Sequence, residues 1–130
     1  MSKNAKGSIL IIENNELTRL TYKTQIEPLV EKLSMAKNAI TTLNMINQYG
    51  NTFDLILLNI VLPDMNGFKL AEKLRKKGIK APIIAISAND IQIEVQTIYR
   101  TIFSAFFVKP LTLKKIICLI EEYIKNKPLN

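Results

Sequence analysis

Polar side chains follow four apolar runs of this sequence, and together they supply a carboxylate, amides, a hydroxyl and an amine. Glu13 and Asn14 close the first run, and Asn59 lies near the end of another. Ser87 ends a third run, and Lys109 follows the last one. If these runs are parallel strands, their carboxyl ends meet at one edge of a sheet. We therefore expect these side chains to form one site.

The residue types exclude several kinds of chemistry. The chain has no histidine, which removes the commonest general base and metal ligand. The segment "IIENNEL" contains no glycine, which argues against a nucleotide-binding loop after the first run. Neither a Cys–His pair nor a Ser-x-Gly elbow supplies a hydrolase nucleophile. An enzyme is not expected.

The elements that must position these groups are predicted from the apolar pattern. Four runs are nearly continuous, as in a sheet that is covered on both faces, whereas "EKLSM" is polar enough for an edge strand. The predicted strands are Ser8–Glu13, Glu31–Met35, Asp54–Ile60, Pro82–Ser87 and Ala105–Val108. A strand followed by a helix recurs five times along the chain. Crossover rules then give a doubly wound α/β domain with a parallel sheet and helices on both faces.

Apolar residues at helical spacing predict which helix faces contact the sheet. The predicted stripes are Leu17, Leu20 and Thr24; Ile40, Leu43 and Ile46; Phe68, Ala71 and Leu74; Ile91, Val95, Ile98 and Ile102; and Leu113, Ile116, Ile117, Ile120 and Ile124. Thr112 is expected to cap the last helix, and Gly78 to end the third. Asn66 and Gly67 predict a turn before the third helix.

Length and composition favour one cytoplasmic domain. The chain has 130 residues, of which 48% are hydrophobic. We expect a single domain over residues 8–126, with flexible ends at 1–7 and 127–130. No apolar run is long enough for a membrane span, and no apolar signal core follows the N-terminus. The lone cysteine, Cys118, suits a reducing compartment and is expected to be a small core or interface filler.

The net charge of +7 could attract nucleic acid or an acidic partner. Six of the basic residues lie between Lys69 and Lys80, mostly on one predicted helix. No aromatic residue is interleaved there for base stacking. This pattern favours a solvated helix face over a nucleic-acid site.

Four motifs, in this order, resemble those of response-regulator receiver domains of bacterial two-component signalling. They are "ILIIENNE", "DLILLNIVLPDMNGF", "PIIAISA" and "FFVKPL", and the resemblance extends from about Ser8 to Ile124. It implies a flavodoxin-like fold of three layers, with five helices and five parallel strands in the order 2-1-3-4-5. In that family an aspartate at the end of the third strand accepts a phosphoryl group from a histidine kinase. Magnesium is held there by carboxylates.

The resemblance assigns a role to each polar residue at the predicted site. Asn59 matches the acceptor aspartate, and Glu13 and Asn14 match the acidic pair that closes the first strand. The remaining matches are Ser87 and Lys109 for the phosphoryl contacts, Phe106 for the aromatic that changes rotamer on activation, and Pro110 for a proline that usually follows a cis peptide bond.

Two amides replace carboxylates in this pattern. A neutral amide at Asn59 cannot form an acyl phosphate by the family's route. With Glu13 as the remaining carboxylate, we expect magnesium binding to be weak or absent and assign no metal or cofactor. Asn59 is expected to bond Lys109 or Ser87 instead. Lys109 is expected either to pair with Glu13 or to bind an anion.

These features predict an atypical stand-alone receiver in two-component or phosphorelay signalling that acts through a protein partner. The partner would be a histidine kinase, an output protein or a second copy of the chain. The fourth helix, fifth strand and fifth helix form the output face in the family, and here they carry surplus apolar residues. These candidate interface residues are Ile93, Tyr99, Phe103, Leu119 and Tyr123. The alternatives are a phosphoacceptor that uses another residue, and a basic domain that binds anions or nucleic acid.

Overall fold

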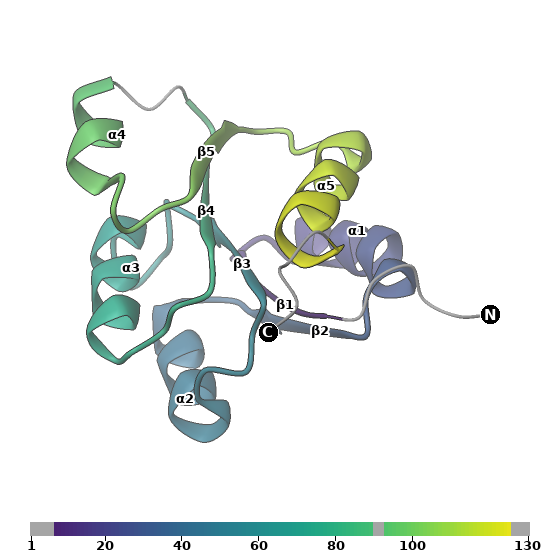
Figure 1. Ribbon diagram of the computed structural model, residues 1–130, viewed down its shortest axis with the longest axis horizontal. Helices are drawn as coiled ribbons and strands as arrows, with labels where there is room; N and C mark the ends of the chain where they lie inside the picture. Colours follow the sequence, from purple (N-terminus) through teal and green to yellow (C-terminus); the bar gives the residue numbers. More distant parts are fainter. Residues whose placement is uncertain (1–6, 90–92, 126–130) are drawn as a thin grey trace.

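The computed structural model describes residues 7–89 and 93–125, and it contains a parallel sheet of five strands (Figure 1). The strand order is β2-β1-β3-β4-β5, which confirms the predicted topology. Each strand lies within one residue of its predicted bounds. The strands are β1 (Ser8–Ile12), β2 (Lys32–Ala36), β3 (Leu55–Asn59), β4 (Ile83–Ser87) and β5 (Ala105–Val108). The polar segment "EKLSM" is part of an edge strand, as expected.

Helices cover both faces of the sheet, as Figure 1 shows, with α1 and α5 on one face and α2, α3 and α4 on the other. The helices are α1 (Glu16–Ile26), α2 (Ala39–Tyr49), α3 (Gly67–Lys76), α4 (Ile93–Tyr99) and α5 (Leu113–Ile120). A short 3₁₀ turn (Glu27–Leu29) follows α1, and a π-helical turn (Glu121–Lys125) extends α5. No helix in the described ranges is both long and apolar enough to cross a membrane.

Alternate residues of the central strands enter two separate cores. Leu10 and Leu58 pack with α2 and α3, whereas Ile9 and Leu57 pack with α1 and α5. Because both faces of each central strand are covered, the strands read as continuous apolar runs. This burial explains why the sheet could be predicted from the sequence.

Several predicted helix faces are wrong. Leu17 and Leu20 are 72% and 58% exposed, and α1 instead buries Tyr22 and Ile26. The two buried residues lie four apart and therefore share one helix face. Other residues of the predicted stripes that the structure exposes are Thr24, Ile40, Ile98, Leu113 and Ile117. Ile91 lies outside the described residues.

The candidate interface set is also corrected. Phe103 follows α4 where the chain turns into β5, and Leu119 lies beside Ile120 on the buried side of α5; their exposed fractions are 3% and 5%. Tyr99 is half-buried and stacks on Phe68, with ring centroids 4.6 Å apart. Tyr123 is also half-buried, and the side chain of Ile93 is outside the described part. Cys118 is exposed, so it is not a core filler.

The chain leaves α4 without a glycine cap. The N–H groups of Ile102 and Phe103 both donate to the carbonyl of Tyr99 at 2.9 Å. The Arg75 guanidinium then donates to the Ile102 carbonyl, with Nη2 at 2.6 Å. No described non-glycine residue has a positive φ, so this end avoids the strained left-handed conformation.

The turns around the third helix and the cap of the last are as predicted. Asn66 Oδ1 accepts from Phe68 N at 2.7 Å, and Thr112 Oγ1 accepts from Lys115 N at 3.3 Å. Gly78 has a φ of 91° just after α3. Of the chain ends predicted to be flexible, residues 1–6 and 127–130 lie outside the described ranges, whereas Gly7 is buried against the core.

Candidate functional site

The carboxyl ends of β1, β3 and β5 bring Glu13, Asn14, Asn59 and Lys109 together, as the sequence predicted. Glu13 directly follows β1, and its backbone N–H donates to the Ala36 carbonyl at 3.0 Å. This bond places the Glu13 side chain at the rim of the sheet. Glu13 and Asn59 are both buried there.

Lys109 neutralises the buried carboxylate of the site. Its Nζ lies 2.9 Å from Glu13 Oε1, and the two side chains are 29% and 3% exposed, respectively. Lys109 was expected either to pair with Glu13 or to bind an anion, and the structure shows the pair with Glu13. The peptide bond from Lys109 to Pro110 is cis, in agreement with the family resemblance.

The second carboxylate oxygen of Glu13 is also engaged. Oε2 accepts from the backbone N–H of Asn15 at 2.9 Å and from Asn59 Nδ2 at 3.4 Å. The Arg19 guanidinium donates to the Glu13 backbone carbonyl at 2.8 Å. Both oxygens of this buried carboxylate thus have donors, as a buried charge requires.

Asn59 does not bond Lys109 or Ser87, which corrects the prediction. Its Nδ2 donates to the Val61 carbonyl at 2.9 Å and to Asn14 Oδ1 at 3.1 Å. The amine of Lys109 is already directed to Glu13, and the Val61 carbonyl lies two residues from Asn59. Local geometry therefore determines the amide's partners.

Ser87, the last residue of β4, and Phe106, within β5, do not enter this network. Ser87 is half-buried, and its Oγ accepts from Asn89 N at 3.3 Å. The Phe106 ring lies 5.3 Å from the ring of Phe103, measured between centroids. Phe106 is half-buried against the core that α2 and α3 cover.

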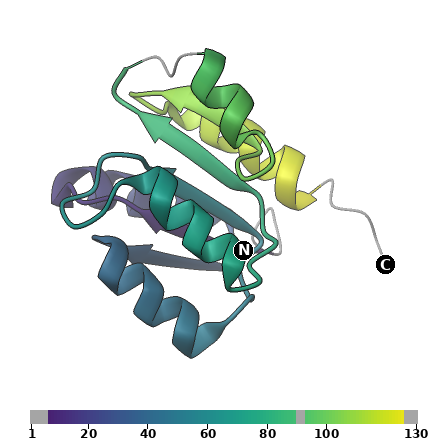
Figure 2. The same ribbon diagram turned by 90° about the vertical axis from the view of Figure 1, so that its left-hand side faces the viewer.

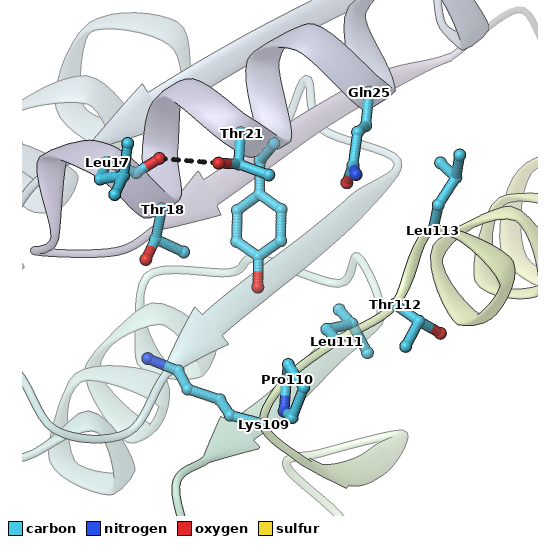
Figure 3. A pocket seen from close by; sticks show the side chains of 10 residues that line it. Leu17, Thr18, Thr21, Gln25, Lys109, Pro110, Leu111, Thr112 and Leu113 are labelled. Carbon is cyan, nitrogen blue, oxygen red and sulfur yellow. Dashed lines mark hydrogen bonds between the residues drawn. The ribbon is translucent and has the colours of Figure 1, made fainter.

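Next to Lys109 lies a pocket of about 340 Å³ that the sequence did not indicate. Figure 3 shows Leu17, Thr18 and Thr21 of α1 on one side and the segment that begins at Lys109 on the other. Tyr22 also lines it. Burial, and to a lesser extent the charge of Glu13, raises the pKa of Tyr22 to about 12. The exposed Leu17, which lines the pocket, would have indicated this surface had its exposure been predicted.

The donor set of the site does not fit magnesium. Mg²⁺ binds hard, charged oxygens in near-ideal octahedral geometry. Glu13 is the one carboxylate in the network, and its two oxygens already accept from Lys109, Asn15 and Asn59. In the described part of the chain, no three His, Cys, Asp or Glu residues are grouped as a metal site would require. A divalent ion would have to displace the Lys109 ammonium.

Comparison with known families decides the classification. The profile of the response regulator receiver domain matches residues 9–121. The chain belongs to the response regulator receiver family. The matched residues include the ends of β1, β3 and β5, which form the site described above.

Curated relatives of this receiver are signalling proteins that are mostly longer. The sensor histidine kinase RcsC of Escherichia coli K12 is 25% identical over 129 residues, which cover 97% of this chain and 13% of the kinase. The nisin biosynthesis regulatory protein NisR of Lactococcus lactis is 27% identical, over 94% of this chain and 52% of NisR. The regulator of RpoS of E. coli K12 is 28% identical, over 78% of this chain and 30% of that protein.

Solved receiver structures share the fold. The receiver domain of a Francisella response regulator superposes with a TM-score of 0.78 at 23% identity, and the match covers 90% of this chain and 95% of that one. A CheY-like receiver from Methylobacillus flagellatus gives 0.78 at 20% identity, over 92% and 99% of the two chains. These similarities support the order and direction of all five strands.

Proposed function

We propose that this receiver is not phosphorylated at Asn59 and that it acts in two-component signalling by binding a protein partner. The proposal is based on the hydrogen-bond network at the carboxyl ends of the strands. There the Lys109 ammonium neutralises Glu13, and the Asn59 amide donates to Asn14 and Val61. The site is thus satisfied without a phosphoryl group.

The chemistry of an amide supports this proposal. Acyl phosphate formation requires a nucleophilic carboxylate oxygen, and an amide oxygen carries no charge. Lys109 would have to leave a carboxylate that is 3% exposed before it could contact a phosphoryl group. Breaking such a pair is costly because it leaves a buried charge without its partner.

The partner that we propose is a histidine kinase, an output protein or a second copy of the chain. Receiver domains interact with kinases and other signalling proteins, and the relatives include a sensor kinase and two regulatory proteins. Weak or absent magnesium binding and a cytoplasmic location are parts of the same proposal. The last of these rests on a single exposed cysteine.

Acetyl phosphate with magnesium tests the central part of the proposal. We expect intact-mass spectrometry to detect no added phosphoryl group on the wild-type chain. A stoichiometric mass increase that is lost in neutral hydroxylamine would show an acyl phosphate and contradict the proposal. A hydroxylamine-stable increase would instead indicate a hydroxyl acceptor such as Ser87, and peptide mapping would locate it.

A further inference from the structure

The exposed surface of α3 and of the loop that follows it consists almost entirely of lysine. Between residues 67 and 80, every fully exposed residue is a lysine, apart from Gly78. We call this surface the lysine face; its residues are Lys69, Lys73, Lys76, Lys77 and Lys80. The apolar residues of α3, including Leu70 and Leu74, are buried on the opposite side of the helix.

In the described part of the chain, the acidic residues nearest to the lysine face form no ion pair with it. Glu72 is the one acidic residue of α3, and it is half-buried. Within the described ranges, no ion pair involves a lysine of this face. The Asp64 carboxylate, which precedes α3, accepts from Ala39 N and Ile40 N, both at 2.9 Å. The positive charge of the face is therefore directed to solvent.

An uncharged amide surface lies beside these lysines. Figure 2 shows α2 next to α3 on the same side of the sheet, and Lys77 Nζ donates to Asn47 Oδ1 at 3.2 Å. The sequence of α2 contains no charged residue; its exposed residues include Asn44, Asn47 and Gln48, with Ile40 and Tyr49 exposed at its two ends. Amide side chains and lysines together are the groups that contact phosphate and sugar in protein–DNA interfaces.

The opposite side of the molecule has mixed charge. On α5 and its extension, Lys114 and Lys115 are followed by Glu121 and Glu122, and all four are exposed. On α1, Glu16 balances Lys23, and both are exposed. Among the described residues, positive charge is thus most concentrated at α3 and the loop after it, where residues 67–80 carry six basic side chains and one acidic one. These charges can act as one field.

We propose that the lysine face binds the phosphate backbone of double-stranded nucleic acid. The absence of interleaved aromatics argued against base stacking on single strands, and backbone contacts to a duplex do not need aromatic residues. The stretch from Lys69 to Lys76 spans about 10 Å of helix. A duplex presents one charge per about 1.7 Å, so several phosphates lie within reach of this stretch.

The same features disfavour two other polyanions. Membrane-surface helices insert bulky apolar residues beside their lysines, and the exposed positions of the lysine face contain none. A flexible acidic segment would have to lose conformational entropy on binding, whereas a duplex presents its charges already ordered.

Fluorescence anisotropy with a short labelled DNA duplex of arbitrary sequence tests the proposal. We expect binding at about 50 mM salt that weakens as salt rises, with a slope of about −0.9 in log K against log salt for each phosphate contacted. The double variant Lys73→Gln/Lys76→Gln should reduce the magnitude of that slope by about 2. The matched control Lys114→Gln/Lys115→Gln removes the same charge from α5 and should leave the slope unchanged.

Three results would overturn the proposal. The first is no detectable binding of the duplex at about 50 mM salt. The second is an equal loss in the two double variants, which would indicate attraction by net charge alone. The third is tighter binding to polyglutamate or to phosphatidylserine vesicles than to the duplex, which would assign the face to an acidic protein or to a membrane surface. Circular dichroism of both variants checks that each remains folded.

Discussion

Among the individual residues, Glu13 is the one on which the site depends. Its buried carboxylate accepts from Lys109, Asn15 and Asn59, so one side chain connects the ends of β1, β3 and β5. Asn14 and Asn59 contribute neutral amides to this network, so Glu13 is its one carboxylate. The counter-charge of Lys109 is therefore Glu13.

Restoring the two carboxylates should restore magnesium binding. Asn14→Asp together with Asn59→Asp adds two charged oxygens beside Glu13, which gives Mg²⁺ a hard ligand set and gives Lys109 alternative counter-charges. Isothermal titration calorimetry should show magnesium binding to the double variant that is tighter than to either single variant and to the parent. If the double variant binds magnesium no better than the parent, the two amides are not what keeps magnesium from the site.

At the scale of elements, the turn between β3 and α3 depends on Gly67. A Cβ at this position would lie 2.6 Å from Ile60 Cα and 2.8 Å from the Ile60 carbonyl oxygen. Because both neighbours are backbone atoms, Gly67→Ala must shift the chain directly after Asn59. We expect a loss of about 1–3 kcal/mol in the free energy of unfolding by urea denaturation. The control Lys69→Ala, at an exposed site in the same helix, should change it little; an equally stable Gly67→Ala variant would contradict this packing.

The start of α2 depends on Asp64 from the neighbouring loop. Hydrogen bonds from the backbone N–H groups of Ala39 and Ile40 lower the pKa of Asp64 from its ordinary value of 3.8. Because the pKa is lowered in the folded state, the stabilisation is fully present above pH 3.8 and is lost as the pH falls through the folded-state value.

The variant Asp64→Asn tests this acid dependence. It should be less stable than the parent in neutral solution, and the difference should shrink at successive pH values below 3.8. Urea denaturation gives the stability difference, and hydrogen exchange at Ala39 and Ile40 reports the local loss. A stability difference that stays constant into acid would show that the carboxylate charge does not stabilise α2.

For the molecule as a whole, the sheet was predictable, and so was the set of residues at its edge. Continuous apolar runs such as Leu55–Leu58 identify buried strands, and parallel order fixes where their polar ends meet. Helix faces were less predictable, because Leu17 and Ile40 have apolar side chains at suitable spacing but face solvent. Which face of a helix contacts the sheet depends on tertiary packing. The partners of Asn59 were not predictable, because its Nδ2 donates to the carbonyl of Val61, whose position depends on the loop after β3.

The burial of Phe103, a residue predicted to lie at an interface, leads to a prediction about stability. Phe103 is 3% exposed and contacts the rings of Phe68 and Phe106, whereas Ile98 on α4 is 69% exposed. Phe103→Ala should therefore cost about 3–5 kcal/mol in urea denaturation, as large core truncations do. Ile98→Ala should change stability by no more than about 0.5 kcal/mol. Equal stability of the two variants would contradict the burial of Phe103. The Ile98→Ala variant also tests association through α4. If it is folded and as stable as the parent, any change in its sedimentation must come from altered association. A destabilised Phe103 variant could not separate these two effects.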